Sequence, residues 1–155
     1  MSNSNDIEKR TITMKRTFDA PRQLVWEAWT QPGHIARWWG PKGMTTNIKK
    51  HDFREGGEWE YTMPMPNGKE FLTFGKYIKI VSPELIETTA NFIPMTEGVT
   101  LVASFADAGE KTDFTFKVIH PTEGYCKQQE NMGIYNGWGS VFDGLSKYLT
   151  TMVSQ

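Results

Sequence analysis

The sequence predicts an α+β domain in which a curved antiparallel sheet of about seven strands grips a long C-terminal helix. Three observations predict it: one strand and two short helices come first, six strands joined by short turns follow, and a long amphipathic helix ends the chain. Consecutive strands with short connections pair antiparallel, and such a sheet can carry a helix on one face. The two short helices, between the first and second strands, are expected to close one edge.

Alternating apolar and polar residues over 7–18 predict a half-buried first strand. The first helix is expected to begin at Asp19-Ala20-Pro21, because proline suits the first turn of a helix, and to end before Pro32. The second helix is expected to run from Pro32 to Trp39, where Gly40-Pro41 supplies a cap and a residue that cannot continue it. In that helix the adjacent rings of Trp38 and Trp39 share one broad apolar face.

Six further strands are predicted, at 46–53, 58–63, 71–81, 85–93, 99–106 and 112–119. The clearest alternation is that of 58–63. It places three large side chains on one face, Trp59, Tyr61 and Met63. It is expected to place the other three in water, Glu58, Glu60 and Thr62.

The final helix is predicted from about Gly124 or Lys127 to Met152. Its bulky residues form one stripe, which consists of Tyr135, Trp138, Phe142, Leu145, Leu149 and Met152. A second stripe consists of small residues, Gly133, Gly137, Ser140 and Gly144. This second stripe is compatible with close packing against the sheet, with the contact of a homodimer, and with space left for a ligand, so all three interpretations stay open.

Length and composition predict a single domain over 1–155, with residues 1–6 flexible. Seventeen basic and 18 acidic residues are scattered along the chain, which argues against a nucleic-acid partner. No apolar stretch suits a signal peptide or a membrane span, so we expect a cytoplasmic protein without a membrane partner. The lone Cys126 excludes an internal disulfide and a zinc site of paired cysteines, and it is expected to be buried or idle.

No catalytic motif stands out, and we therefore expect no catalytic residue, no cofactor and no metal. Gly137-Trp138-Gly139-Ser140 lacks the third glycine of a dinucleotide fingerprint and follows no strand. The histidines lie in three segments, never at the spacing of a helical metal pair, and each is expected to be exposed or hydrogen-bonded: His34, His51 and His120. Glu58 and Glu60 form a carboxylate pair, but one expected on a solvated face.

Aromatic residues make up 13% of the chain, more than a thin layer of sheet and helix needs for its core. Rings that cannot close-pack often wall a pocket for a small apolar molecule. Arg16 falls on the apolar side of the first strand, where it could hold an anionic ligand group, pair with a carboxylate or follow a bulge out to solvent. The predicted ligand-binding residues are Arg16, Trp38, Trp39, Trp59, Tyr61, Met63, Phe114, Phe116, Tyr135, Trp138 and Phe142.

A set of residues from 13 to 152 carries a family resemblance: Phe18, Ala20-Pro21, Val25-Trp26, Ala28-Trp29-Thr30, Pro32, Trp38-Trp39, Pro41, Gly43, Gly56-Gly57, Pro66-Asn67-Gly68, Gly75, Pro83-Glu84, Gly137-Trp138, Leu145 and Leu149. With the order of elements, they resemble the START-like (SRPBCC) superfamily of helix-grip, or Bet v-like, proteins. Within it, the chain is similar to the family of the activator of heat-shock protein 90 ATPase. It departs from that pattern at Gly139 and Gly144, where larger residues are expected.

The resemblance implies a deep apolar cavity between the sheet and the long helix, opening near the short helices and the hairpin tips. Relatives bind lipids, polyketides, hormones or alkaloid intermediates, and some catalyse cyclisation or hydrolysis. The second helix would lie at the cavity's rim, with one of the rings of Trp38 and Trp39 anchoring it and the other facing the opening. The sequence leaves open which ring does which.

Three hypotheses about function follow. The first is a binding protein for a small hydrophobic molecule. The second is a regulator of a chaperone ATPase, with the chaperone as partner, although the separate N-terminal domain of that activator is missing here. The third is a cavity enzyme of cyclase or hydrolase type that uses Arg16, Tyr61, Tyr135 or Glu60 for acid–base chemistry. No nucleophile paired with a base is visible, so a non-enzymatic role is favoured.

Overall fold

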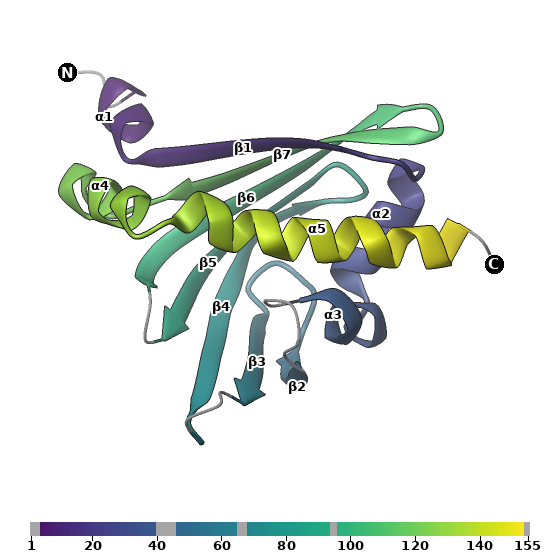
Figure 1. Cartoon of the computed structure of the whole chain (residues 1–155), viewed down its shortest axis with the longest axis horizontal. Helices are drawn as coiled ribbons and strands as arrows, with labels where there is room; N and C mark the ends of the chain where they lie inside the picture. Colours follow the sequence, from purple (N-terminus) through teal and green to yellow (C-terminus); the bar gives the residue numbers. More distant parts are fainter. Residues whose placement is uncertain (1–3, 40–45, 65–67, 94–95, 154–155) are drawn as a thin grey trace.

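A seven-stranded antiparallel sheet curves behind a long C-terminal helix in the computed structural model, which describes residues 4–39, 46–64, 68–93 and 96–153 (Figure 1). The strands are β1 (Thr11–Phe18), β2 (Asn47–His51), β3 (Glu58–Pro64), β4 (Glu70–Val81), β5 (Leu85–Ile93), β6 (Thr96–Ala108) and β7 (Lys111–Ile119). The helices are α1 (Ser4–Lys9), α2 (Arg22–Thr30), α3 (Pro32–Trp38), α4 (Glu123–Asn131) and α5 (Ile134–Val153). The predicted α+β helix-grip fold is confirmed.

The strand order is β1-β7-β6-β5-β4-β3-β2, so the last six strands form the predicted meander. The first strand pairs with the last, Thr11 lying opposite Ile119 and Phe18 opposite Thr112. Because β1 and β2 are therefore the two edges of the sheet, the chain must cross from one edge to the other between them. The helices α2 and α3 make this crossing and contact α5 on the way (Figure 1).

The N-terminal segment differs from the prediction. Residues 7–9, expected to begin the first strand, belong to α1, and the strand starts at Thr11. The turn between them is closed by the backbone N–H of Arg10, which donates to the Ile7 carbonyl oxygen at 3.1 Å. Of the residues expected to be flexible, 4–6 form the start of this helix and 1–3 lie outside the described residues.

The predicted C-terminal helix is two helices, so the prediction of one continuous helix was wrong. Gly133 has a φ of 88°, which lies in the left-handed region that glycine adopts without strain, and it separates α4 from α5. The Thr122 hydroxyl accepts a hydrogen bond from the Tyr125 N–H at 3.1 Å and caps α4, which therefore begins at Glu123. Gly133 is not part of a helical stripe.

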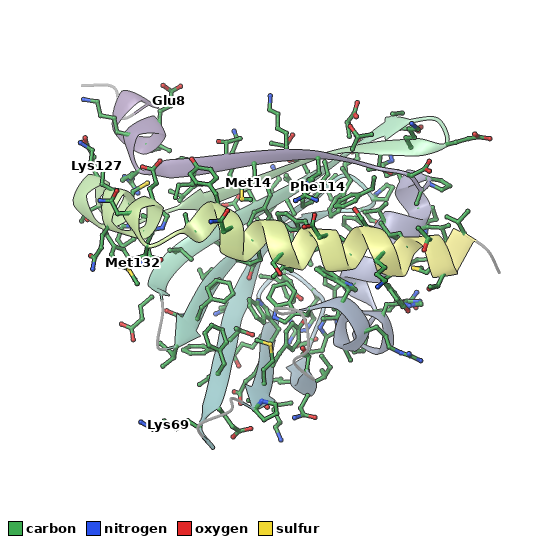
Figure 2. All side chains as sticks on the ribbon, viewed as in Figure 1. Glu8, Met14, Lys69, Phe114, Lys127 and Met132 are labelled. Atoms are coloured by element: carbon green, nitrogen blue, oxygen red, sulfur yellow. The ribbon has the colours of Figure 1, made fainter. Side chains whose placement is uncertain are left out.

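The core is built from rings that both layers contribute. Phe114, labelled in Figure 2, and Phe116 of β7 pack edge-on against Phe142 of α5, with ring centroids 5.2 and 5.1 Å from that of Phe142, and all three are fully buried. On β3, Trp59, Tyr61 and Met63 face inward as predicted.

Thr62 was expected in water but is buried. Its neighbours in register are Asn47 of β2 and Leu72 of β4, whose side chains share its face of the sheet. Glu58 is exposed, as expected, and pairs with Lys50 at 2.6 Å.

Gly75 should be intolerant of any side chain, because a Cβ there would lie 1.9 Å from the Thr89 carbonyl oxygen on the neighbouring strand. We expect Gly75→Ala to lower the free energy of unfolding by about 3 kcal/mol, since the two strands must separate to admit the methyl group. Urea denaturation measures this change. The control is Gly124→Ala, where a Cβ meets no atom within 4 Å. Equal urea midpoints for the two variants would contradict the prediction.

Candidate functional site

A cavity of about 300 Å³ lies between the sheet and the helices α4 and α5, and we call it the outer cavity. It is lined by Trp39, Met63, Phe71, Thr73, Phe92, Val118, Gln129, Met132, Gly133, Ile134, Gly137, Trp138 and Val141. The sheet supplies its floor from β3, β4, β5 and β7, and the junction of α4 and α5 supplies its rim. Met132, at that junction in Figure 2, is 55% exposed, which places the rim in contact with solvent.

The lining of the outer cavity is uncharged and mostly apolar. Its side-chain polar groups include those of Thr73 and Gln129, which are both buried. The Thr73 hydroxyl donates to the Tyr61 carbonyl oxygen at 3.3 Å, and the Gln129 amide lies 3.8 Å from the Met132 sulfur. A charged group would lose its hydration here without gaining an ionic partner from the lining, so the cavity suits uncharged molecules.

A second, smaller cavity of about 30 Å³ lies deeper, and we call it the inner cavity. It is lined by Trp29, Ile35, Trp39, Trp59, Tyr61, Tyr77, Ile86, Thr88, Leu101, Ala103 and Phe116, all of which are buried. The helices α2 and α3 cover it on one side and the strands β3 to β7 on the other. Trp39 lines both cavities and is the side chain that they share.

The two adjacent tryptophans have different positions. The indole N–H of Trp38 donates to the Ala28 carbonyl oxygen at 2.8 Å, and its ring packs 4.9 Å from that of Trp29, so it ties α3 to α2. The ring of Trp39 instead lies among those of Trp59, Tyr61 and Trp138, with centroids 5.6 to 6.0 Å away. Trp38 is therefore the anchor and Trp39 the ring that faces the cavities.

The structure gathers part of the predicted ligand-binding set around the two cavities. Trp39, Met63 and Trp138 line the outer cavity, and Trp39, Trp59, Tyr61 and Phe116 line the inner cavity. Phe114 and Phe142 lie in the core, where they line neither cavity.

Arg16 and Tyr135 line neither cavity. The Arg16 guanidinium contacts Asp143 Oδ1 on α5 at 2.7 Å and donates to the Gly139 carbonyl oxygen at 3.2 Å, so of the three alternatives it pairs with a carboxylate. A Cβ at Gly139 would lie 3.6 Å from this guanidinium. Tyr135 is 45% exposed and donates to Glu130 at 3.4 Å; partial burial and then that carboxylate raise the pKa of its hydroxyl.

Several lining residues were missed. Phe71, Thr73 and Tyr77 alternate along β4 toward the cavities, a signal that the predicted strand already contained. Trp29 lies on the buried face of α2, four residues after Val25, and this helical spacing of apolar residues is a signal that the sequence contains. Gln129 and its neighbours on α4 had no such signal. A single continuous helix was predicted, and it would give these residues a different direction from the one that α4 has in the structure.

The small residues of the final helix serve different purposes. A Cβ at Gly137 would meet no atom within 4 Å, and this residue lines the outer cavity. A Cβ at Gly144 would lie 3.8 Å from the Trp38 carbonyl oxygen, an ordinary van der Waals distance, so this position lies against the end of α3. One position thus borders open space and the other lies against a helix.

Two histidines have environments that lower their pKa. His51 contacts the Thr30 carbonyl oxygen through Nε2 at 2.7 Å and the Tyr61 hydroxyl through Nδ1 at 2.8 Å. His120 is fully buried beside Tyr125 and, as expected, hydrogen-bonded, since its Nδ1 contacts the Arg10 carbonyl oxygen at 3.4 Å; its Nε2 has no hydrogen-bond partner among the described residues. Burial lowers the pKa of both imidazoles below the ordinary value of 6.5, against smaller opposing effects of backbone hydrogen bonds.

Burial raises the pKa of the tyrosine hydroxyls at the inner cavity, Tyr61 and Tyr77, well above their ordinary value. Cys126 is buried, which also raises the pKa of its thiol. Across 4–39, 46–64, 68–93 and 96–153, no three His, Cys, Asp or Glu side chains gather closely enough to hold a metal ion. Over the same ranges, no helix combines the length and apolarity that crossing a membrane requires.

Comparison with known proteins agrees with this architecture. The family model "Activator of Hsp90 ATPase homolog 1-like protein" matches residues 19–150, so the chain belongs to that family, and the expected resemblance is confirmed. No curated protein matches.

Solved structures share the fold. A Mycobacterium smegmatis protein is 23% identical, with a TM-score of 0.83 and 95% of each chain covered. An Arthrobacter aurescens protein is 22% identical, with a TM-score of 0.85, covering 94% of this chain and 89% of its own. An AHSA1-like protein from Aeromonas hydrophila is 20% identical, with a TM-score of 0.74, covering 94% and 95%.

The half-buried His51 and the buried His120 predict a loss of stability in mild acid. Because their pKa is lower in the folded state, the unfolded state binds more protons as the pH falls below 6.5. The stabilisation from the neutral imidazoles is complete above 6.5 and is lost below it, at up to about 1.4 kcal/mol per pH unit for each group. Urea denaturation at pH 7, 6 and 5 gives the free energy of unfolding at each pH. We expect its slope against pH to be smaller in His51→Gln and in His120→Gln than in the wild type. An unchanged slope in both variants would contradict this.

Proposed function

We propose that this protein binds a small hydrophobic molecule in the outer cavity. The observation that carries the proposal is the cavity itself, with its volume of about 300 Å³ and its uncharged, ring-rich lining. This volume is at the lower end of the range of about 300–1,000 Å³ that is typical of small-molecule sites, which are mostly apolar with a few polar groups. Thr73 and Gln129 are such groups here.

The aromatic lining supplies the driving force for binding. An apolar ligand that enters would be removed from water over much of its surface, which contributes about 25 cal/mol per Å² of apolar area. Phe92 and Trp138 meet edge to face at 5.3 Å, and Trp39 lies 6.0 Å from Trp138, so a flat ring can contact several ring faces or edges. Aromatic or other ring-containing ligands are therefore favoured over short aliphatic ones.

The junction of α4 and α5 offers an entrance. Met132 is more than half exposed, Gly137 is exposed, and both line the outer cavity. A flexible methionine and a residue without a side chain adapt readily to a ligand that passes between them. This entrance lies at the α4 end of α5, away from the short helices α2 and α3 (Figure 1).

Regulation of a chaperone ATPase is a second candidate, and the family match supports it. Incubation of the purified chain with the chaperone, followed by measurement of ATP hydrolysis, separates the two candidates. If the chain stimulates ATP hydrolysis by the chaperone, and a variant with a blocked outer cavity stimulates it equally, the chaperone role is favoured and does not depend on ligand binding.

Gly137→Leu should block the outer cavity without damaging the fold. The new side chain enters space that is open in the wild type, and leucine is a better helix former than glycine. We expect the Kd of the neutral fluorescent probe N-phenyl-1-naphthylamine to rise at least about tenfold, the equivalent of about 1.4 kcal/mol. The enhancement of probe fluorescence measures it, and thermal unfolding reports that the fold is intact.

The matched control for this prediction is Asn136→Leu. It adds the same side chain at the preceding, exposed position of α5, which lines neither cavity, and its Kd should equal that of the wild type. Equal loss of binding in both variants, or no binding of any neutral ring-containing probe to the wild type, would overturn the proposed function.

A further inference from the structure

One side chain that lines the inner cavity carries a buried hydrogen-bond donor with no partner among the described residues. The indole nitrogen of Trp29 is fully buried and has no hydrogen-bond partner among the described residues, although the side chain lines this cavity. An unpaired N–H away from water is costly, so such groups in native proteins usually meet a polar partner. Trp59 shows the contrast, because its indole N–H donates to the Thr88 hydroxyl at 2.8 Å.

Hydrogen bonds at the edge of the inner cavity determine where each proton lies. The Thr30 carbonyl oxygen can only accept, so the His51 nitrogen that contacts it, Nε2, must bear the proton. Burial keeps this imidazole neutral, and its Nδ1 is therefore an acceptor. The Tyr61 hydroxyl, 2.8 Å from Nδ1, must donate to it.

A second tyrosine supplies an acceptor at the inner cavity. Because the only proton of the Tyr61 hydroxyl is given to His51, Tyr61 has no proton left for a ligand. Tyr77 lines the same cavity, and the oxygen of its hydroxyl can accept a hydrogen bond. The cavity thus combines an unpaired donor, Trp29 Nε1–H, with an available acceptor, Tyr77 Oη, and a hydroxyl group satisfies both because it accepts and donates.

We propose that the inner cavity binds the hydroxyl group of a neutral, otherwise apolar ligand, such as a phenol or an alcohol. Trp29 Nε1–H donates to the hydroxyl oxygen, and the hydroxyl donates to the oxygen of Tyr77. This proposal rests on the proposed function, since the apolar body of the ligand occupies the outer cavity and reaches the inner one beside Trp39, which lines both.

Size and charge support a hydroxyl over other polar groups. About 30 Å³ is enough for a group the size of a hydroxyl or a water molecule, but not for a further ring. No Asp, Glu, Lys or Arg of the described residues lines either cavity, so a carboxylate or an ammonium group would be buried without a counter-ion. A lone water molecule would satisfy the same two groups, and the experiment must separate it from a ligand hydroxyl.

Three probes with one apolar body make this test: biphenyl, 4-phenylphenol and biphenyl-4-carboxylate, with Kd values measured at pH 7 by calorimetry. The decisive quantity is the ratio of the 4-phenylphenol affinity to the biphenyl affinity, because it cancels losses that affect the whole cavity. We expect this ratio to fall about five- to tenfold in Trp29→Phe and in Tyr77→Phe, the loss of one hydrogen bond in each. The carboxylate should bind more weakly than both neutral probes.

The chain offers matched controls for both variants. Trp26→Phe and Tyr148→Phe make the same changes at side chains that line neither cavity, and the affinity ratio should stay at the wild-type value. A second measurement covers the case in which a core variant does not fold. In the wild-type chain, the indole proton signal of Trp29 should move downfield in the NMR spectrum with 4-phenylphenol and not with biphenyl.

The outcomes separate the two proposals. If biphenyl binds but the ratio is the same in all five proteins and the Trp29 indole signal does not respond to the hydroxyl, the hydroxyl site is refuted and the proposed function stands. A water molecule that stays in the inner cavity would produce this result. If none of the probes binds the wild-type chain, both proposals fail.

Discussion

The cavities depend on the way in which α5 packs across the sheet, tightly from Val141 onward and loosely before it. Phe142, Leu145 and Leu149 are fully buried against the sheet and the short helices. Toward the N-terminus of α5, Trp138 and Ile134 are only partly buried. The C-terminal part of α5 therefore packs closely on the sheet, whereas its N-terminal part does not. The outer cavity lies under the N-terminal part.

A cluster of aromatic rings connects α5 and the sheet to the helices that cover the inner cavity. Trp29 of α2 lies within 6.4 Å of Trp38, Phe116 and Phe142, measured between ring centroids, so it joins the short helices to both the sheet and α5. Aromatic side chains are large and rigid, and each pair prefers a tilted or edge-on geometry, so such a cluster rarely fills space completely. The small inner cavity is the space that this cluster and β3 to β6 leave.

Most of the fold was predictable from the sequence, because hydrophobic periodicity is a local property. Trp59, Tyr61 and Met63 face inward as the alternation over 58–63 predicts, although Thr62 on the opposite face is also buried. The break at Gly133 was missed, since a glycine in an amphipathic stretch gives no local sign that its φ is positive. Of the cavity residues, those on predicted inward faces, such as Trp59 and Met63, were identifiable, whereas Gln129 required the true direction of α4.

The sequence by itself determined the order of the seven strands and of α2 and α3, the inward faces of the strands and the family, because these follow from spacing along the chain and from matching residues. Only the tertiary structure decided between Trp38 and Trp39, since the sequence predicts one helical face for both rings, whereas α3 ends at Trp38 and the two rings differ in what surrounds them. The same holds for Arg16, whose carboxylate partner lies 127 residues away. The outer cavity is lined by Trp39 at the end of α3 and by side chains from α4, α5 and four strands. No local sequence pattern predicts such a cavity, because it depends on how those elements pack in space.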